Sequence, residues 1–253
     1  MRQLIAPMLG LTLVCARPAA GQEWTADLGA VARLRPAHMG SNSYRTDLMP
    51  YVAASYGVDL SCSLDDGAKW RVMKSGDASF GLVGEYRQSF NDALTTDVFR
   101  TRDAVEVGGY AERRTRLGVA SLRLRRALNG YRGWSGDLAF DTGGKLTPSL
   151  EAGLEARLSW ADQRFTEEYF GRHPAPRSVF GAPRFHDDDF VTAGVEVDAA
   201  KSLSPATRLV IALSADRMLG ELPSRGPFPT RNIFTLSIGV VRHWSRSIQG
   251  SRS

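Results

Sequence analysis

The stretch SLEAGLEARLSW, residues 149–160, alternates between two kinds of side chain with a period of two. Leu150, Leu154 and Leu158 belong to an apolar face that ends at Trp160, whereas the intervening positions are polar, charged or glycine. Successive side chains of an extended chain point to opposite faces of a sheet, so this pattern predicts a long amphipathic β-strand.

The same alternation recurs along most of the chain, for example in residues 24–34, 79–87, 117–126, 190–199 and 234–240. A soluble sandwich would bury the apolar faces, whereas a transmembrane barrel turns them towards lipid and keeps the polar faces in its lumen. Segments of roughly 10 to 13 residues, tryptophans near segment ends, and alternating long and short connections all favour the membrane barrel. The sequence therefore predicts an all-β fold, a single transmembrane antiparallel β-barrel.

The predicted barrel has twelve strands, an even count that places both termini on one side, which we expect to be the periplasm. Asp65-Asp66-Gly67 interrupts the region 58–75. If this region forms one irregular segment instead of the two strands 58–64 and 69–75, the barrel has ten strands. Short connections are predicted at 57–58, 113–115, 143–146 and 201–205, and long ones at 36–46, 89–102, 161–187 and 218–230. The predicted strands are 24–35, 47–57, 58–64, 69–75, 78–88, 103–112, 116–127, 132–142, 147–160, 188–200, 206–217 and 231–244.

The N-terminus has the pattern of a secretory signal peptide. Arg2 precedes an uncharged apolar run over residues 4–16, and the small residues Ala19-Ala20-Gly21 follow. This run is too short for a transmembrane helix. We expect cleavage before Gln22, which divides the chain into a signal peptide (1–21), a barrel (22–244) and a short C-terminal extension (245–253).

The composition excludes several classes of protein. A hydrophobic content of 43% and a charged content of 23% argue against intrinsic disorder and against a helical multi-pass membrane protein. The net charge of +5 is mild and its arginines are scattered, whereas nucleic-acid binding requires a basic patch or stripe. The mean hydropathy of −0.23 is typical of a soluble protein, but an average cannot register alternation. The alternation and the signal peptide together predict the outer membrane of a Gram-negative bacterium, with outer-membrane lipids as partners.

Two groups of residues resemble motifs of one protein family. The first group follows the long strand in residues 158–174, and the second opens and closes the last predicted strand. A third likeness lies in residues 40–51, and Ser204-Pro205 before a strand is a further one. The motif residues are Trp160, Asp162, Tyr169, Phe170 and Gly171 in the first group and Arg231, Asn232, Phe234, Gly239 and Trp244 in the second.

In order and spacing, these motifs resemble the MipA/OmpV family of outer-membrane proteins. The resemblance implies an outer-membrane barrel that acts as an envelope scaffold between a lytic transglycosylase and a murein synthase. Other members of the family are treated as adhesins, antigens or porin-like proteins, so a narrow channel for small polar solutes or a surface adhesin remains an alternative. The chain departs from the usual barrel C-terminus because Arg242 occupies a normally apolar position and residues 245–253 trail beyond Trp244.

Charged residues recur on the polar faces of the predicted strands. One interpretation is the lining of a selective pore, and the other is a network of ion pairs that fills a narrow lumen. Both signs occur in similar numbers, which favours pairing and a mostly filled lumen. The predicted lumen-facing charges are Glu85, Arg87, Arg123, Arg125, Glu151, Glu155, Arg157, Glu196 and Asp198.

The sequence offers little for catalysis or metal binding. Its four histidines, His38, His173, His186 and His243, lie in predicted loops or at a rim, and no serine elbow accompanies them. The acidic run 186–189 has adjacent side chains that point in alternate directions on an extended chain, so we interpret it as a solvated strand entrance. The prediction is a non-enzymatic barrel without catalytic residues, metal or cofactor.

Overall fold

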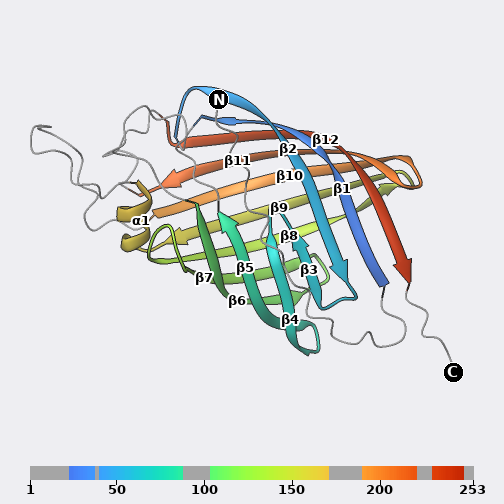
Figure 1. Cartoon of the computed structure of the whole chain (residues 1–253), viewed down its shortest axis with the longest axis horizontal. Coiled ribbons are helices and arrows are strands. Elements are labelled where there is room, and N and C mark those ends of the chain that lie inside the picture. Colours follow the sequence, from blue (N-terminus) through green and yellow to red (C-terminus); the bar gives the residue numbers. More distant parts are fainter. Residues whose placement is uncertain (1–22, 38–39, 88–102, 171–189, 221–229, 248–253) are drawn as a thin grey trace, which may run out of the picture.

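The computed structural model describes residues 23–37, 40–87, 103–170, 190–220 and 230–247. Within them, twelve antiparallel strands form a closed barrel in which consecutive strands pair and β1 pairs with β12 (Figure 1). The predicted all-β barrel of twelve strands is confirmed, and the alternative count of ten is wrong. The strands are β1 (Glu23–Pro36), β2 (Tyr44–Tyr56), β3 (Leu60–Ser63), β4 (Gly67–Ser75), β5 (Ala78–Arg87), β6 (Ala104–Arg114), β7 (Val119–Ala127), β8 (Trp134–Thr147), β9 (Leu150–Ala161), β10 (Phe190–Ser204), β11 (Thr207–Leu219) and β12 (Asn232–Ser247).

The outer surface of the barrel is apolar and the inner surface is polar. On β9, Leu154 and Leu158 expose 46% and 43% of their surface, whereas Glu155 and Arg157 between them are half-buried. Burial of apolar surface away from water drives folding in aqueous solution, so a water-facing exterior of this kind would be unfavourable. Closure of the barrel also pairs the strand edges that lipid could not solvate. The exterior is therefore suited to contact with lipid.

Two turns differ from their predicted positions. β8 continues through the predicted turn at 143–146, and β10 continues through most of the predicted turn at 201–205. The chain reverses instead over two residues, 148–149 and 205–206. Each of these turns begins with a proline, Pro148 or Pro205, whose fixed φ suits the first corner of a tight turn. The prediction gave too much weight to Gly143-Gly144, which β8 accommodates opposite Ala152 and Gly153.

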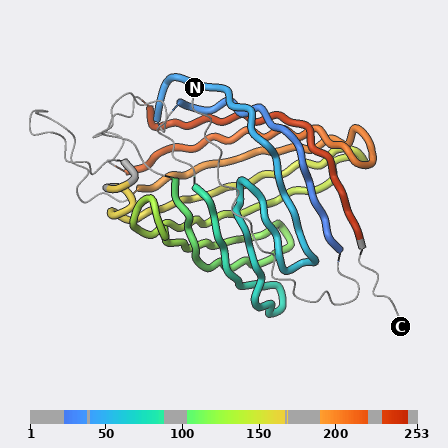
Figure 2. The backbone as a smooth tube through the Cα atoms, viewed as in Figure 1, coloured from blue at the N-terminus to red at the C-terminus, as the bar shows by residue number. Residues whose placement is uncertain are grey.

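The hairpin of β3 and β4 is the shortest part of the wall (Figure 2). β3 has four residues, so its contact with β2 is limited to Ala53–Tyr56, and its other edge pairs with β4. Asp65-Asp66-Gly67 turns the chain early, because Gly67 adopts a φ of 73° that other residues rarely accept. The carboxylates of Asp65 and Asp66 are thereby held beside the lumen.

A short helix, α1 (Gln163–Phe170), begins where a loop was predicted. Asp162 caps it, since the Asp162 carboxylate accepts a hydrogen bond from the Phe165 N–H at 2.9 Å. The sequence held this signal, an aspartate directly after the strand, but a search for two-residue alternation does not detect a helix of about two turns. Residues 171–187 of the predicted loop lie outside the described part of the chain.

The two ends of the described chain meet at one end of the barrel. Glu23 of β1 lies opposite Ser247 of β12, so the chain enters and leaves on the same side. β12 continues three residues past its predicted end at Trp244. Among the described residues, no helix has the length and apolar character needed to cross a membrane.

Candidate functional site

The lumen at the α1 end contains a group of charged side chains that we call the Arg125 cluster: Glu85, Arg87, Glu106, Arg125 and Asp137. They come from four consecutive strands, β5 to β8, and the register places Glu85 directly opposite Glu106. Two like charges in direct opposition are destabilising unless a cation lies between them. The Arg125 guanidinium contacts Glu85, Glu106 and Asp137, and Arg87 Nε lies 3.2 Å from Glu106 Oε1.

Two members of the Arg125 cluster, Glu106 and Arg125, are shielded from water. Glu106 is 0% exposed and Arg125 is 2% exposed, which is unusual for charged side chains. Two further groups satisfy the Glu106 carboxylate, because the Tyr131 hydroxyl donates to it and the Ser135 hydroxyl donates at 3.2 Å. A buried charge persists when it is both paired and hydrogen-bonded, as Glu106 is here.

An apolar cap covers the Arg125 cluster at the α1 end. Phe165 of α1 is buried, and its ring meets the Tyr131 ring edge-on with 4.8 Å between centroids. Phe190 stacks on the other side of Phe165 at 6.4 Å. The helix thus carries an aromatic side chain into the barrel mouth, and the cap connects to the charges through Tyr131.

A second group of ion pairs, the Arg157 cluster, lies on the wall formed by β9, β10 and β11. Arg157 Nη2 is 2.8 Å from Asp216 Oδ2, and Arg157 Nη1 is 3.2 Å from Glu155 and 3.6 Å from Glu196. Gly194 leaves the space for the Asp216 carboxylate, since a Cβ there would overlap Asp216 Oδ1. One arginine therefore links three carboxylates from three strands.

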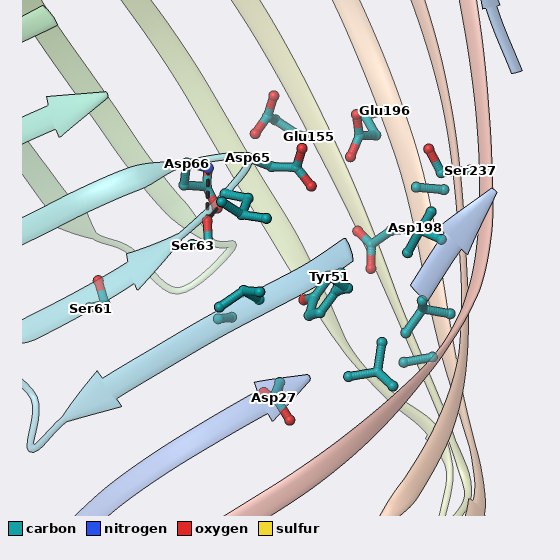
Figure 3. A pocket seen from close by; sticks show the side chains of 18 of the residues that line it. Asp27, Tyr51, Ser61, Ser63, Asp65, Asp66, Glu155, Glu196, Asp198 and Ser237 are labelled. Atoms are coloured by element: carbon teal, nitrogen blue, oxygen red, sulfur yellow. Dashed lines mark hydrogen bonds between the residues drawn. The ribbon is translucent and has the colours of Figure 1, made fainter. Parts of the chain in front are cut away.

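A cavity of about 930 Å³ occupies the lumen, and the Arg157 cluster forms part of its lining. Figure 3 shows Glu155 and Glu196 on one wall, with Asp65 and Asp66 of the β3–β4 turn beside the same space. The turn is held by two ion pairs, Arg33–Asp65 at 2.8 Å and Arg123–Asp66 at 3.6 Å. These pairs join the hairpin to β1 and to β7, so the hairpin tip forms part of the cavity wall.

Near the end of the barrel that holds both chain ends, Asp27 lies between two cationic or ionisable groups. Its carboxylate is 3.0 Å from Arg208 Nη2 and 2.8 Å from His243 Nδ1. His243 is therefore engaged with a carboxylate in the barrel wall. The described hydrogen-bond partners of the His243 ring are Asp27 and Arg208. Neither of them is a serine, threonine or cysteine that the histidine could activate as a nucleophile.

The structure places the predicted lumen-facing charges in several different surroundings. Glu85, Arg87 and Arg125 meet in the Arg125 cluster, and Glu155, Arg157 and Glu196 meet in the Arg157 cluster. Arg123 binds the hairpin tip, and Asp198 lines the cavity. Glu151 stands apart from the others, because it lies one residue after the start of β9 and faces Lys145 at 3.7 Å with nearly half of its side chain exposed.

Sequence reasoning missed three carboxylates that complete these clusters, Glu106, Asp137 and Asp216. Each lies on a polar face of the same two-residue alternation, as Glu106 does between Val105 and Val107. The signal was present, but alternation alone does not distinguish a partner of a buried arginine from an ordinary lumen residue. Tyr131 was missed for another reason, because it lies in the connection between β7 and β8.

The family-like motif residues are distributed over both surfaces. Trp160 faces outwards near the end of β9, Asp162 caps α1, and Tyr169 and Phe170 are the last residues of α1, whereas Gly171 lies outside the described residues. In the second group, Arg231 precedes β12 and Asn232 begins it, and Phe234 and Trp244 face outwards. Gly239 lies against β1, where a Cβ would be 2.5 Å from the carbonyl oxygen of Ala30.

The described part of the chain contains no group of three or more metal-ligating side chains arranged to hold an ion. The acidic run 186–189 and three of the four histidines lie outside the described residues. The chemistry available in the described lumen is thus that of paired carboxylates and guanidinium groups around a polar cavity.

The solved structures that resemble this chain include outer-membrane proteins. An outer-membrane channel of Pseudomonas putida F1, COG4313, is 12% identical with a TM-score of 0.43, and the match covers 90% of this chain and 97% of that one. The NanC porin is 9% identical with a TM-score of 0.44, over 85% of this chain and 98% of that one. At these values, neither likeness supports an inference about function.

No curated protein matches the sequence. A family model does match, that of the MltA-interacting protein MipA, and it aligns with residues 28–244. The match extends from the first strand to the last and includes both clusters and most of the cavity wall. This barrel, with its lipid-facing exterior and arginine-centred lumen, belongs to the MipA family of outer-membrane proteins.

Proposed function

We propose that this outer-membrane barrel acts as a non-enzymatic scaffold or interaction protein of the cell envelope, linked to the enzymes that synthesise and hydrolyse murein. The Arg125 cluster and its aromatic cap are the observation that carries the proposal. They join four strands at the α1 end of the lumen through mutually paired charges, two of which are buried, and this suits a rigid anchoring body better than an open pore. The family description, an MltA-interacting protein, supports a murein enzyme as partner.

The scaffold proposal includes an orientation. Residues 1–21 direct export and are removed, and both ends of the mature chain face the periplasm. The tight turns at 148–149 and 205–206 then lie on the periplasmic side with the ends of β1 and β12. A partner anchored in or near the periplasm would meet this end of the barrel. The residues that it contacts are not assigned.

The scaffold proposal predicts capture of murein enzymes from intact envelopes. Cross-linking of cells that express the tagged full-length chain, followed by affinity purification, is expected to enrich a lytic transglycosylase and a murein synthase. An unrelated tagged barrel at the same expression level is the control. Equal recovery of both enzymes with the two barrels would contradict the proposal.

A second function, a narrow channel for small polar solutes, is favoured by the cavity of about 930 Å³. The two functions differ in their expected conductance.

If the Arg125 cluster fills the lumen, the protein in planar bilayers is expected to lack stable ohmic openings of high conductance. Arg87→Ala with Arg125→Ala is expected to raise the open probability, because the two guanidinium groups that bridge the cluster are removed. Large, steady openings of the unchanged protein would favour the channel and contradict the filled lumen.

A further inference from the structure

Two arginines and three aromatic residues form one outward-facing patch at the end of the barrel where β12 closes on β1. We call this set the β12–β1 rim patch: Trp24, Tyr56, Arg242, Trp244 and Arg246. Arg242, Trp244 and Arg246 alternate with His243 and Ser245, so the three share the outer face of β12. The register places Trp24 beside both Arg246 and Tyr56, which brings the aromatic residues of three strands together.

The patch has the composition of a membrane interface. Trp24 and Trp244 expose about 40% of their surface outside the barrel, where tryptophan and tyrosine favour the headgroup region. The Arg242 guanidinium lies 5.5 Å from the centroid of the Trp244 ring. This stacking turns the long side chain along the barrel surface, towards the end of the strand and the headgroups. It also explains how an arginine is accommodated at a normally apolar position of the last strand.

The arginines of the patch have no described carboxylate partner. Arg242 and Arg246 are exposed, and none of the described ion pairs includes either of them. The neighbouring carboxylates are engaged or face elsewhere: Asp59 binds Arg71 at 2.7 Å, and Glu23 shares the inward side of β1 with Asp27. A guanidinium that is weakly hydrated and unpaired beside lipid is a good ligand for phosphate, which it can bind through two hydrogen bonds.

From this geometry we infer that the β12–β1 rim patch binds the phosphate of an anionic glycerophospholipid. The Cα atoms of Arg242 and Arg246 are four residues apart along a strand, roughly 13 Å, so their side chains can bracket one headgroup above Trp244. The glycerol and first methylenes would lie against Trp24 and Trp244, and the phosphate would accept from both guanidinium groups. The phosphate site does not depend on the scaffold proposal, because it concerns the lipid-facing surface and not the lumen. The choice of a glycerophospholipid over lipid A, which also carries phosphates, rests on the periplasmic orientation proposed for this end of the barrel.

The opposite rim offers a matched control. Arg126 also faces outwards and lies 5.7 Å from the centroid of the Trp134 ring. Arg126 and Trp134 lie opposite each other on β7 and β8 at the α1 end, away from the seam of β12 and β1. Arg126→Gln therefore removes one stacked arginine without changing the proposed site.

The experiment compares lipid binding to the purified full-length protein in detergent by native mass spectrometry. Phosphatidylglycerol, phosphatidylcholine with the same acyl chains, and lipid A are titrated separately. The unchanged protein is expected to bind phosphatidylglycerol more tightly than the other two. Arg242→Gln with Arg246→Gln is expected to weaken phosphatidylglycerol binding about tenfold, with phosphatidylcholine binding unchanged. Arg126→Gln is expected to change phosphatidylglycerol binding less than twofold.

Several outcomes would overturn the inference. These are equal binding of phosphatidylglycerol and phosphatidylcholine, an affinity of the double variant within twofold of the unchanged protein, or the same loss in Arg126→Gln. Tighter binding of lipid A would overturn the assignment to a glycerophospholipid. Heat-modifiable gel migration establishes that each variant is folded. If the double variant does not fold, Arg246→Gln alone, which breaks no described contact, is expected to weaken binding about threefold, and an unchanged affinity would refute the site.

Discussion

Arg125→Leu is expected to lower the free energy of unfolding by about 3–5 kcal/mol, the cost typical of removing one partner from a buried ion pair. Leucine leaves Arg87 as the remaining described cation for both Glu85 and Glu106, and it removes a partner of Asp137. Water cannot replace the lost guanidinium, because Glu106 is buried beneath Tyr131 and the apolar cap. Urea unfolding of the barrel in lipid vesicles, followed by tryptophan fluorescence, measures the difference.

Arg45→Leu is the matched control for Arg125→Leu. Arg45 and Arg35 both pair with Asp47, and the Arg35 pair at 2.7 Å remains when Arg45 is replaced. The expected loss is below about 1 kcal/mol, as for other part-exposed ion pairs. Adding Glu106→Gln to Arg125→Leu should recover part of the stability, since Arg87 then has one of the two opposed carboxylates to offset instead of both. Equal stability of Arg125→Leu and Arg45→Leu would show that the Arg125 cluster does not stabilise the barrel.

Gly108→Ala is expected to destabilise the barrel by about 1–3 kcal/mol or to prevent its closure, because a side chain at this position overpacks the junction of β6 and β7. A Cβ on Gly108 would overlap the carbonyl oxygen of Leu124 and lie 2.7 Å from Cα of Arg125. The atoms that it meets belong to the backbone of β7, which cannot move without breaking the ladder that also positions Arg125.

Gly144→Ala provides the control, since a Cβ on Gly144 of β8 has no neighbour within 4 Å. Both substitutions exchange a strand glycine for alanine, so their intrinsic effects on strand formation are similar. Unfolding in urea and heat-modifiable migration are measured for both variants. A Gly108→Ala protein as stable as Gly144→Ala would show that the close approach of β6 and β7 relaxes without cost.

Alternation predicted the barrel well because its cause is local. A strand that separates lipid from a polar lumen must change side-chain character at every residue, and residues 149–160 do so whatever their neighbours are. The same pattern favoured twelve strands, but the short region of β3 and β4 left ten as an alternative. The helix α1 was missed because a single cap at Asp162 competes with a longer β-signal. The turns were misplaced because glycines in β8 resembled a turn, whereas the prolines at 148 and 205 marked the true ones.

The clusters in the lumen were less predictable. Glu85, Arg87 and Arg125 were expected in the lumen, but their common partner, Glu106, was not singled out. Glu151 has the same place in the alternation as Glu155 and lies at a turn with Lys145 instead. The two glutamates have different surroundings because they lie at different positions along the barrel axis. Which residues of neighbouring strands share such a position depends on the stagger between strands, which the sequence of a single strand does not encode.

By itself, the sequence determined the two-faced strands, the apolar exterior and the family, because each depends on side-chain order along one segment. It favoured twelve strands over ten, and the closed barrel decided between the two counts. The tertiary structure alone decided which charges meet, that Arg125 and Arg157 each link three carboxylates, and that Arg242 stacks on Trp244 at the seam of β12 and β1. These contacts join residues far apart in the chain, such as Arg157 and Asp216. Barrel closure and inter-strand register bring them within hydrogen-bonding distance, and both are properties of all twelve strands together.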